Sequence, residues 1–452
     1  MSTENPSLTG YPPKDHHQVE NIEDSAASSN NAPVVFLDEE ISHTAKAAFA
    51  ASYGLLVAGR TIGGIGVGTL AMGAPIYISE IAPPNLRGTL LVLESVSCVL
   101  GVVVSFWITY GTRNLPGELA FRLPFGLQMV CSTVLGIGIH FFPYSPRWLA
   151  LVDRSDDALL SLEKLRRLPR SDPRVDKEHI GIMNEVALQK IMQEKRHPGV
   201  GGLNLEILGW KDLFQKKSWH RTSIAVGVAF FQQLSGINAF IYYAPTLFQS
   251  LGQSSEMSVI MSGVFNMLQL VAVTVCFFII DKVGRRPLAI WGGIGGGTAW
   301  GIMAVLVGVY NDKWSSNSSA GWAAVAMAFC FILIYGVSYA PLGWALPAEV
   351  FPNASRSKGV ALATATVWLF NFIVGVATPP MIESIGFGVY ILGSWCFLAA
   401  VWAFFLVPET KGKTLEQMDE IFGDHAGQEE LEIMQSRMGI AEYGLKKDVV
   451  EV

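Results

Sequence analysis

The chain contains nine apolar stretches long enough to cross a membrane, and this feature limits its fold more than any other. Half of the 452 residues are hydrophobic and only 15% are charged. A spanning helix needs about 20 mostly apolar residues, and only helices or closed barrels satisfy all backbone polar groups in hydrocarbon. We therefore predict an all-α, polytopic membrane protein. The expected spans lie near residues 53–79, 90–110, 124–142, 222–248, 258–280, 287–309, 322–348, 358–381 and 387–407.

A repeated charge spacing indicates that the chain is internally duplicated. Glu80 and Arg87 stand seven residues apart after one apolar stretch, and Glu349 and Arg356 repeat that spacing after another. The second copy has three further apolar stretches before the one that ends at Glu349, whereas a polar segment precedes the stretch that ends at Glu80. Duplicated six-helix halves are typical of secondary transporters. We expect that the first half is N-terminally truncated and lacks its first three spans.

The pattern of polar and apolar segments predicts five parts. Residues 1–50 are polar and predicted to be disordered, and 51–146 form a partial N-terminal half with three spans. Residues 147–221 are predicted to be a cytoplasmic loop with short helices, 222–407 a C-terminal six-helix half, and 408–452 a cytoplasmic tail. Lys and Arg concentrate in alternate connecting segments, which places the C-terminus in the cytoplasm. We expect a multi-pass protein of the plasma membrane.

Several carboxamides and aromatic side chains lie inside the apolar stretches, where unpaired polar groups are costly. Carboxamides donate and accept hydrogen bonds, and an indole covers the apolar face of a pyranose, so this set suits a neutral polyhydroxy ligand. Interhelical hydrogen bonding without a ligand is the alternative interpretation. The candidate binding residues are Gln232, Gln233, Asn238, Tyr242, Asn266, Trp344, Trp368 and Asn371.

Charged residues cluster at the predicted cytoplasmic ends of the helices. They are either surface charges worth at most about 1 kcal/mol per pair or ion pairs that close this side in one state and break in another. The duplicated spacing favours the second interpretation. The candidate gating residues are Glu80, Arg87, Arg147, Asp281, Arg285, Arg286, Glu349, Arg356 and Glu409.

Other classes of function find little support in the sequence. No nucleophile with its base, metal-ligand cluster or nucleotide loop is present, so we predict neither an enzyme nor a cofactor. A net charge of −6 gives no reason to expect nucleic acid. From these residues we expect the partners to be a neutral polyhydroxy ligand and the lipid bilayer.

At these residues the chain resembles the sugar porters of the major facilitator superfamily, in particular fungal monosaccharide transporters. The resemblance covers about residues 50–425. The matching motifs are Gly59-Arg60, the run from Pro75 through Tyr77 and Glu80 to Arg87-Gly88, QQLSGINAFIYYAP at 232–245, DKVGRRP at 281–287, Trp344 with Glu349 and Arg356, and PETKGKTLEQMD at 408–419.

The resemblance implies a major facilitator helix bundle that transports a hexose or pentose by rocking-type alternating access, often with proton symport in fungi. It also implies substrate contacts at Gln232, Gln233, Asn238, Asn266, Trp344 and Asn371, and gating at the charged pairs. The chain departs from the family at Ser95, where a sugar-contacting Gln is usual, and at Tyr144, where PESPR reads PYSPR.

Because three spans are expected to be missing, we predict poor transport by this chain alone. A non-transporting sugar sensor and a regulatory fragment are the alternative functions.

Overall fold

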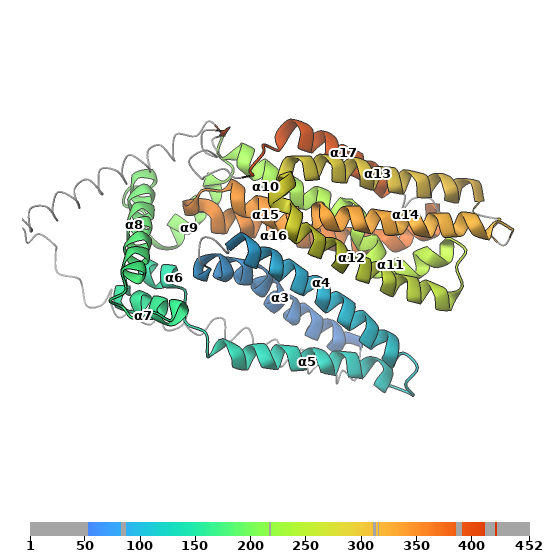
Figure 1. Ribbon diagram of the computed structural model, residues 1–452, viewed down its shortest axis with the longest axis horizontal. Coiled ribbons are helices and arrows are strands. Elements are labelled where there is room, and N and C mark those ends of the chain that lie inside the picture. The colour runs from blue at the N-terminus through green and yellow to red at the C-terminus, as the bar shows by residue number, and fades with distance from the viewer. Residues whose placement is uncertain are drawn as a thin grey trace, which may run out of the picture. The chain divides into compact units, whose positions relative to one another are not determined.

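The computed structural model describes residues 53–82, 87–216, 218–310, 313–314, 316–385, 391–411 and 421–422, and within them the chain is helical without strands (Figure 1). Helices within the predicted spans are α3 (Tyr53–Ile81), α4 (Arg87–Thr112), α5 (Leu119–Ile139), α10 (Trp219–Leu234), α11 (Ile237–Ser250), α12 (Ser255–Val283), α13 (Arg285–Tyr310), α14 (Ser318–Val337), α15 (Tyr339–Val350), α16 (Asn353–Ile385) and α17 (Leu392–Leu406). The segment between α5 and α10 contains α6 (Pro146–Leu151), α7 (Ser155–Arg166), α8 (Pro173–Arg196) and α9 (Gly202–Asp212).

The membrane-spanning character of the chain is confirmed. In the described part, eight helical segments are long and apolar enough to cross a bilayer, and they correspond to the first eight predicted spans. Two of these segments each contain a break, which separates α10 from α11 and α14 from α15. The ninth predicted span contains α17, an apolar helix of 15 described residues. The predicted disordered segment 1–50 lies outside the described residues.

The chain divides into two compact units. Among the described residues, one comprises 53–70 and 112–142, and the other comprises those of 71–111 and 143–422. In the first unit, the Arg60 guanidinium of α3 lies 4.6 Å from the centre of the Phe125 ring of α5. In this cation–π contact the negative face of the ring attracts the guanidinium, which lowers the cost of placing the charge in an apolar helix.

The larger unit packs around an aromatic core between α11, α12, α13 and α14. Phe240 is stacked on Phe265 with ring centres 5.0 Å apart, and its ring centre lies 5.1 Å from that of Trp300. Glycines on α13 allow close approach: a β-carbon on Gly293 would lie 2.6 Å from the Cys396 carbonyl oxygen of α17. Small residues at such contacts are how membrane helices pack without a hydrophobic driving force between them.

Both helix breaks have a local cause in the backbone. Gly236, between α10 and α11, has a φ of +87°, a left-handed conformation that glycine adopts without steric cost. Ser338, between α14 and α15, has φ −115° and ψ −88°, which interrupts the helical hydrogen bonding. Helices broken in the middle of a membrane expose backbone groups inside the protein, where side chains or ligands can bind them.

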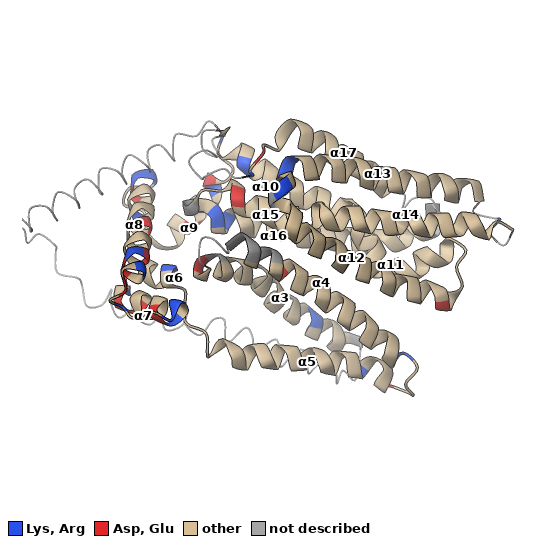
Figure 2. Cartoon of the chain, viewed as in Figure 1, with Lys and Arg blue, Asp and Glu red and all other residues tan. Residues whose placement is uncertain are grey.

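Most charged residues lie outside the spans. Figure 2 shows them over α6 to α9 and near the ends of the spanning helices, whose middle parts are largely uncharged. Helices α6, α7 and α8 share a small apolar core that includes Leu162, Val175 and Val186. Arg166 binds both Glu178 oxygens, at 2.6 and 2.8 Å, and donates to the Ile81 carbonyl at the end of α3. This arginine therefore attaches the helical linker to a spanning helix.

The start of α8 provides a pH-dependent prediction. Hydrogen bonds from the Arg174 side chain and backbone lower the pKa of Asp172 to about 2. The pKa of Asp172 in the folded protein is thus lower than the ordinary aspartate pKa of about 3.9. Asp172 therefore stabilises the fold fully at a pH above about 3.9, and this stabilisation is lost as the pH falls through about 2. Asp172→Ala should therefore speed hydrogen exchange in the first turn of α8 at pH 7. Asp176→Ala, in the same turn, is the control, and equal exchange in both variants would contradict the prediction.

Candidate functional site

Three predicted carboxamides form a hydrogen-bonded chain across the first helix break, and we call Gln232, Gln233 and Asn238 the amide cluster. The Asn238 amide donates to Gln233 Oε1, and Gln233 Nε2 donates to Gln232 Oε1 at 3.5 Å. Their exposed fractions are only 3–5%. A continuous helix would not place these residues on one narrow face. The break at Gly236 changes the direction of the chain between the two glutamines and Asn238, and the three side chains meet.

Gln232 also joins the two broken helices. Its Nε2 donates to the carbonyl oxygens of Tyr339 and Ala340, at 3.1 and 3.3 Å, in the first turn of α15. A β-carbon on Gly343 would collide with the Gln232 carboxamide, so this glycine leaves the space that the amide occupies. The amide nitrogen of Gln232 is therefore hydrogen-bonded to the backbone of α15. Among the described residues, the Gln233 and Asn238 side chains are hydrogen-bonded only to one another and to Gln232.

A buried tryptophan holds the first break in place. Trp300 of α13 is fully buried, and its Nε1 donates to the Ser235 carbonyl at 3.0 Å. The Cys396 thiol approaches the same carbonyl at 3.6 Å. A β-carbon on Gly236 would lie 2.6 Å from the Trp300 ring, so glycine is required there by space as well as by φ. These contacts fix the backbone between Gln233 and Asn238.

Removal of the Trp300 N–H should destabilise the protein. Trp300→Phe keeps an aromatic ring but leaves the buried Ser235 carbonyl with only the weak thiol donor, at a cost of about 1–3 kcal/mol. We expect a lower melting temperature in detergent. Trp291→Phe, on the same helix but 70% exposed, is the matched control and should melt like the wild type. Equal melting of both variants would show that the Trp300 hydrogen bond contributes nothing.

The remaining predicted binding residues lie on α11, which also carries Asn238, and on α12, α15 and α16. The Tyr242 hydroxyl donates to Asn371 Oδ1 of α16 at 2.8 Å. Trp368 lies one turn before Asn371 and exposes 41% of its surface, and Trp344 of α15 is half-buried. Helix α16 packs against both α10 and α11. The structure thus pairs Tyr242 of α11, one helical turn after Asn238, with Asn371 of α16.

Helix α12 carries one predicted residue and one that sequence analysis missed. The oxygen atoms of Asn266 and Gln269 are buried, and neither has a hydrogen-bond donor among the described residues. Gln269 belongs to none of the recognised motifs, so it was not predicted. The sequence feature that could have identified Gln269 is its position in an apolar stretch, three residues after another carboxamide, Asn266.

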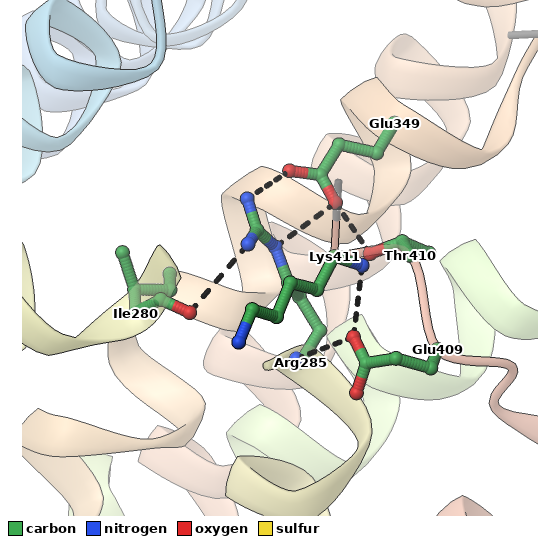
Figure 3. Close-up of polar contacts among 6 residues, drawn as sticks. All are labelled: Ile280, Arg285, Glu349, Glu409, Thr410 and Lys411. Carbon is green, nitrogen blue, oxygen red and sulfur yellow. Dashed lines mark hydrogen bonds and ion pairs between the residues drawn. The ribbon is translucent and has the colours of Figure 1, made fainter. Parts of the chain in front are cut away.

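Three of the predicted gating residues, Arg285, Glu349 and Glu409, lie together where the ends of α12, α13 and α15 meet the segment after α17 (Figure 3). Arg285 binds Glu349 through two hydrogen bonds, Nη2 to Oε1 at 2.8 Å and Nε to Oε2 at 3.2 Å. Thr410 also donates to Glu349, at 2.6 Å. Glu409 accepts from the backbone N–H groups of Arg285 and Arg286, at 3.0 and 3.2 Å. A carboxylate there favourably opposes the positive end of the α13 dipole.

Lys411 completes this group, which we call the charged cluster: Arg285, Glu349, Glu409, Thr410 and Lys411. Lys411 Nζ donates to the Lys282 carbonyl at the end of α12, at 2.5 Å. The cluster therefore joins the end of α12, the start of α13 and the end of α15 to the chain after α17. Such an arrangement can resist separation of these helix ends until its ion pair breaks.

The other predicted gating residues have different partners. Arg286 donates to the Phe404 carbonyl at 2.7 Å, and Arg356 donates to the Phe351 carbonyl at 3.4 Å. Arg147 pairs with Glu185 of α8 at 2.5 Å, and Ser145 donates to Glu80. The side chains of Arg87 and Asp281 lie outside the described residues.

Tyr144, which replaces the usual glutamate of the family motif, packs on an aromatic neighbour. Its ring is stacked on that of Trp148, with centres 5.7 Å apart. Glu185 of α8 supplies the carboxylate that binds Arg147. In this chain, an ion pair of Arg147 therefore involves the helical linker.

Comparison with known proteins supports the class that the fold and these sites define. Residues 36–422 match the family described as Sugar (and other) transporter. A high-affinity glucose transporter of Kluyveromyces lactis is 34% identical over 388 residues, which are 82% of this chain and 68% of that protein. A probable quinate permease of Aspergillus clavatus is 34% identical over 383 residues, with the same two coverages.

The fold is that of the major facilitator superfamily. The chain is similar to the proton:xylose symporter XylE bound to 6-bromo-6-deoxy-D-glucose, with a TM-score of 0.68, 24% identity, and coverage of 87% of this chain and 83% of that one. The family match, the named transporters among the relatives and the fold show a multi-pass membrane transporter, which is not an enzyme. The chain belongs to the sugar transporter family.

Proposed function

We propose that this protein transports a neutral monosaccharide, a hexose or a pentose, by alternating access. The amide cluster carries the proposal, because three buried carboxamides in a membrane bundle offer paired donors and acceptors to hydroxyl groups. No cationic side chain is hydrogen-bonded to the described members of the cluster. This composition favours a neutral sugar over the carboxylate quinate, although relatives are named for glucose and for quinate.

The proposed binding residues are Gln232, Gln233 and Asn238, with Tyr242 on the helix of Asn238 and with Asn371, Trp368, Trp344 and Asn266 on neighbouring helices. The charged cluster is proposed to hold its side of the bundle closed in one state of the cycle. The concentration of Lys and Arg in alternate loops supports a cytoplasmic location for this side and for the C-terminus. A C-terminal epitope that antibody reaches only after permeabilisation of the plasma membrane is the expected result.

The proposal is tested by counterflow of labelled sugars in proteoliposomes. D-Glucose or D-xylose should accumulate slowly, but above the level in protein-free liposomes, when the same unlabelled sugar is trapped inside, and trapped quinate should have little effect. Preference for quinate over both sugars would overturn the neutral-substrate assignment. Proton coupling is included in the proposal because a structurally similar protein is named a proton:xylose symporter. Sugar accumulation that does not respond to an imposed proton gradient would reject that part.

A further inference from the structure

Helix α9 and the turn after it present a row of exposed apolar side chains on one face. Leu203, Ile207, Trp210 and Phe214 expose 77%, 46%, 40% and 55% of their surfaces, and we call them the apolar stripe. Successive residues of a helix turn by about 100°, so steps of four, three and four residues keep the stripe within about 60°. Every residue of α9 keeps part of its surface exposed, whereas α6, α7 and α8 bury an apolar core of their own.

An adjacent side of α9 is attached to the bundle of spanning helices. Lys358 of α16 pairs with Glu206 at 3.0 Å. Leu213, the residue that follows α9, is fully buried in an apolar cluster with Ala225 of α10 and Ala363 of α16. These contacts hold α9 against two spans and leave the apolar stripe beside the contact, not under it.

The contacts of Leu213 place the end of α9 at the level where two spans begin (Figure 1). The Thr222 hydroxyl of α10 donates to the Leu213 carbonyl at 2.7 Å. Thr222 lies inside the apolar segment Trp219–Ser250, and Ala363 lies inside the segment Ser355–Ile382. Trp219 is 55% exposed, and tryptophan is enriched where a membrane meets water. The apolar stripe is therefore continuous with the lipid-facing surface of the spans.

Basic side chains lie next to the apolar stripe. Lys211 and Lys216 are exposed, and neither forms an ion pair within the described part of the chain. The two acidic residues of α9, Glu206 and Asp212, are already bound to other side chains. An apolar face bordered by lysines is typical of a helix that lies in the membrane interface and attracts anionic lipids. The unpaired lysines thus complement acidic headgroups at the level of the bilayer surface.

We propose that α9 and the turn after it form a binding site for anionic phospholipids. The apolar stripe enters the adjacent leaflet, and Lys211 and Lys216 contact the acidic headgroups. The inference does not depend on the proposed substrate, because it rests on the membrane-spanning character of the chain and on the surface of α9. Through the ion pair of Glu206 with Lys358, lipid bound at this site also holds the beginning of α16 in place.

Hydrogen exchange of the full chain in lipid nanodiscs tests the proposal. Each lysine near an anionic surface strengthens binding roughly fivefold. The α9 amides should therefore exchange roughly ten- to thirtyfold more slowly in phosphatidylcholine mixed with phosphatidylserine than in phosphatidylcholine alone. The double variant Lys211→Gln, Lys216→Gln should abolish this difference. The matched control, Lys164→Gln with Lys177→Gln, removes two exposed lysines from α7 and α8 and should preserve it.

A substitution in the apolar stripe tests its insertion into lipid. Ile207→Ser should speed α9 exchange in both kinds of nanodisc, because a polar side chain is unfavourable in the leaflet. Equal α9 exchange of the wild type in both lipid compositions, or a lipid difference that survives Lys211→Gln with Lys216→Gln, would overturn the inference. Protection in both compositions that disappears on deletion of residues 426–452 would also overturn it and assign the stripe to the C-terminal tail. None of these outcomes bears on sugar binding, so the proposed function would stand.

Discussion

Gln233→Ala is expected to raise the D-glucose concentration for half-maximal binding by roughly tenfold to a hundredfold, the effect of one or two hydrogen bonds. Gln233 accepts from Asn238 and donates to Gln232, so its loss removes one binding group and releases another. The measurement is isothermal titration of the purified protein with D-glucose and D-xylose.

The control for this prediction is a glutamine on the same broken helix pair but away from the amide cluster. Gln249, near the end of α11, is exposed, and its amide donates to Ser255. Gln249→Ala should leave the affinity unchanged within about twofold. If Gln233→Ala and Gln249→Ala titrate alike, Gln233 does not contact the sugar.

Glu349→Gln is expected to slow the transport cycle much more than it weakens binding. The substitution keeps the shape of the side chain but removes the charge that binds Arg285 through two hydrogen bonds. Side-chain exposures of 12% for Arg285 and 31% for Glu349 show that the pair is partly shielded from water. Charge-assisted bonds of this kind contribute about 1–3 kcal/mol. The balance between the two states of the cycle should therefore shift by roughly 5- to 150-fold.

The rate of counterflow and the affinity for D-glucose are compared in the variant and the wild type. Glu118→Gln serves as the control, since Glu118 pairs with Arg122 within one turn and its side chain is 69% exposed. That variant should cycle normally. A Glu349→Gln protein that has lost affinity but keeps its maximal rate would contradict a gating role for the charged cluster.

The spans of this protein were predictable because each one is encoded locally. An apolar stretch of sufficient length becomes a helix in a membrane whatever its neighbours, and the eight long segments follow the predicted ranges. The positions of the helix breaks were harder to predict from the sequence. Gly236 lies in a long apolar stretch like many other glycines, and the residue that packs against its left-handed turn, Trp300, comes more than sixty residues later.

The candidate sites were predictable as sets of residues but not as pairs. Carboxamides in apolar stretches indicated a polar interior, and three of them meet in the amide cluster. Pairing depends on which helices are neighbours, which spacing along the chain does not specify. Hence Glu349 is bound by Arg285 of a different helix, although the repeated spacing drew attention to Arg356. Gln269 was not predicted, because only three-dimensional packing shows that its buried oxygen has no donor among the described residues.

The most direct test of the central claim is equilibrium binding of D-glucose and of quinate to the wild type and to Gln233→Ala. Our account predicts saturable glucose binding by the wild type, strong weakening in Gln233→Ala, and little binding of quinate by either protein. Glucose binding that is unchanged by Gln233→Ala, or preferential binding of quinate, would contradict the assignment of the amide cluster to a neutral sugar.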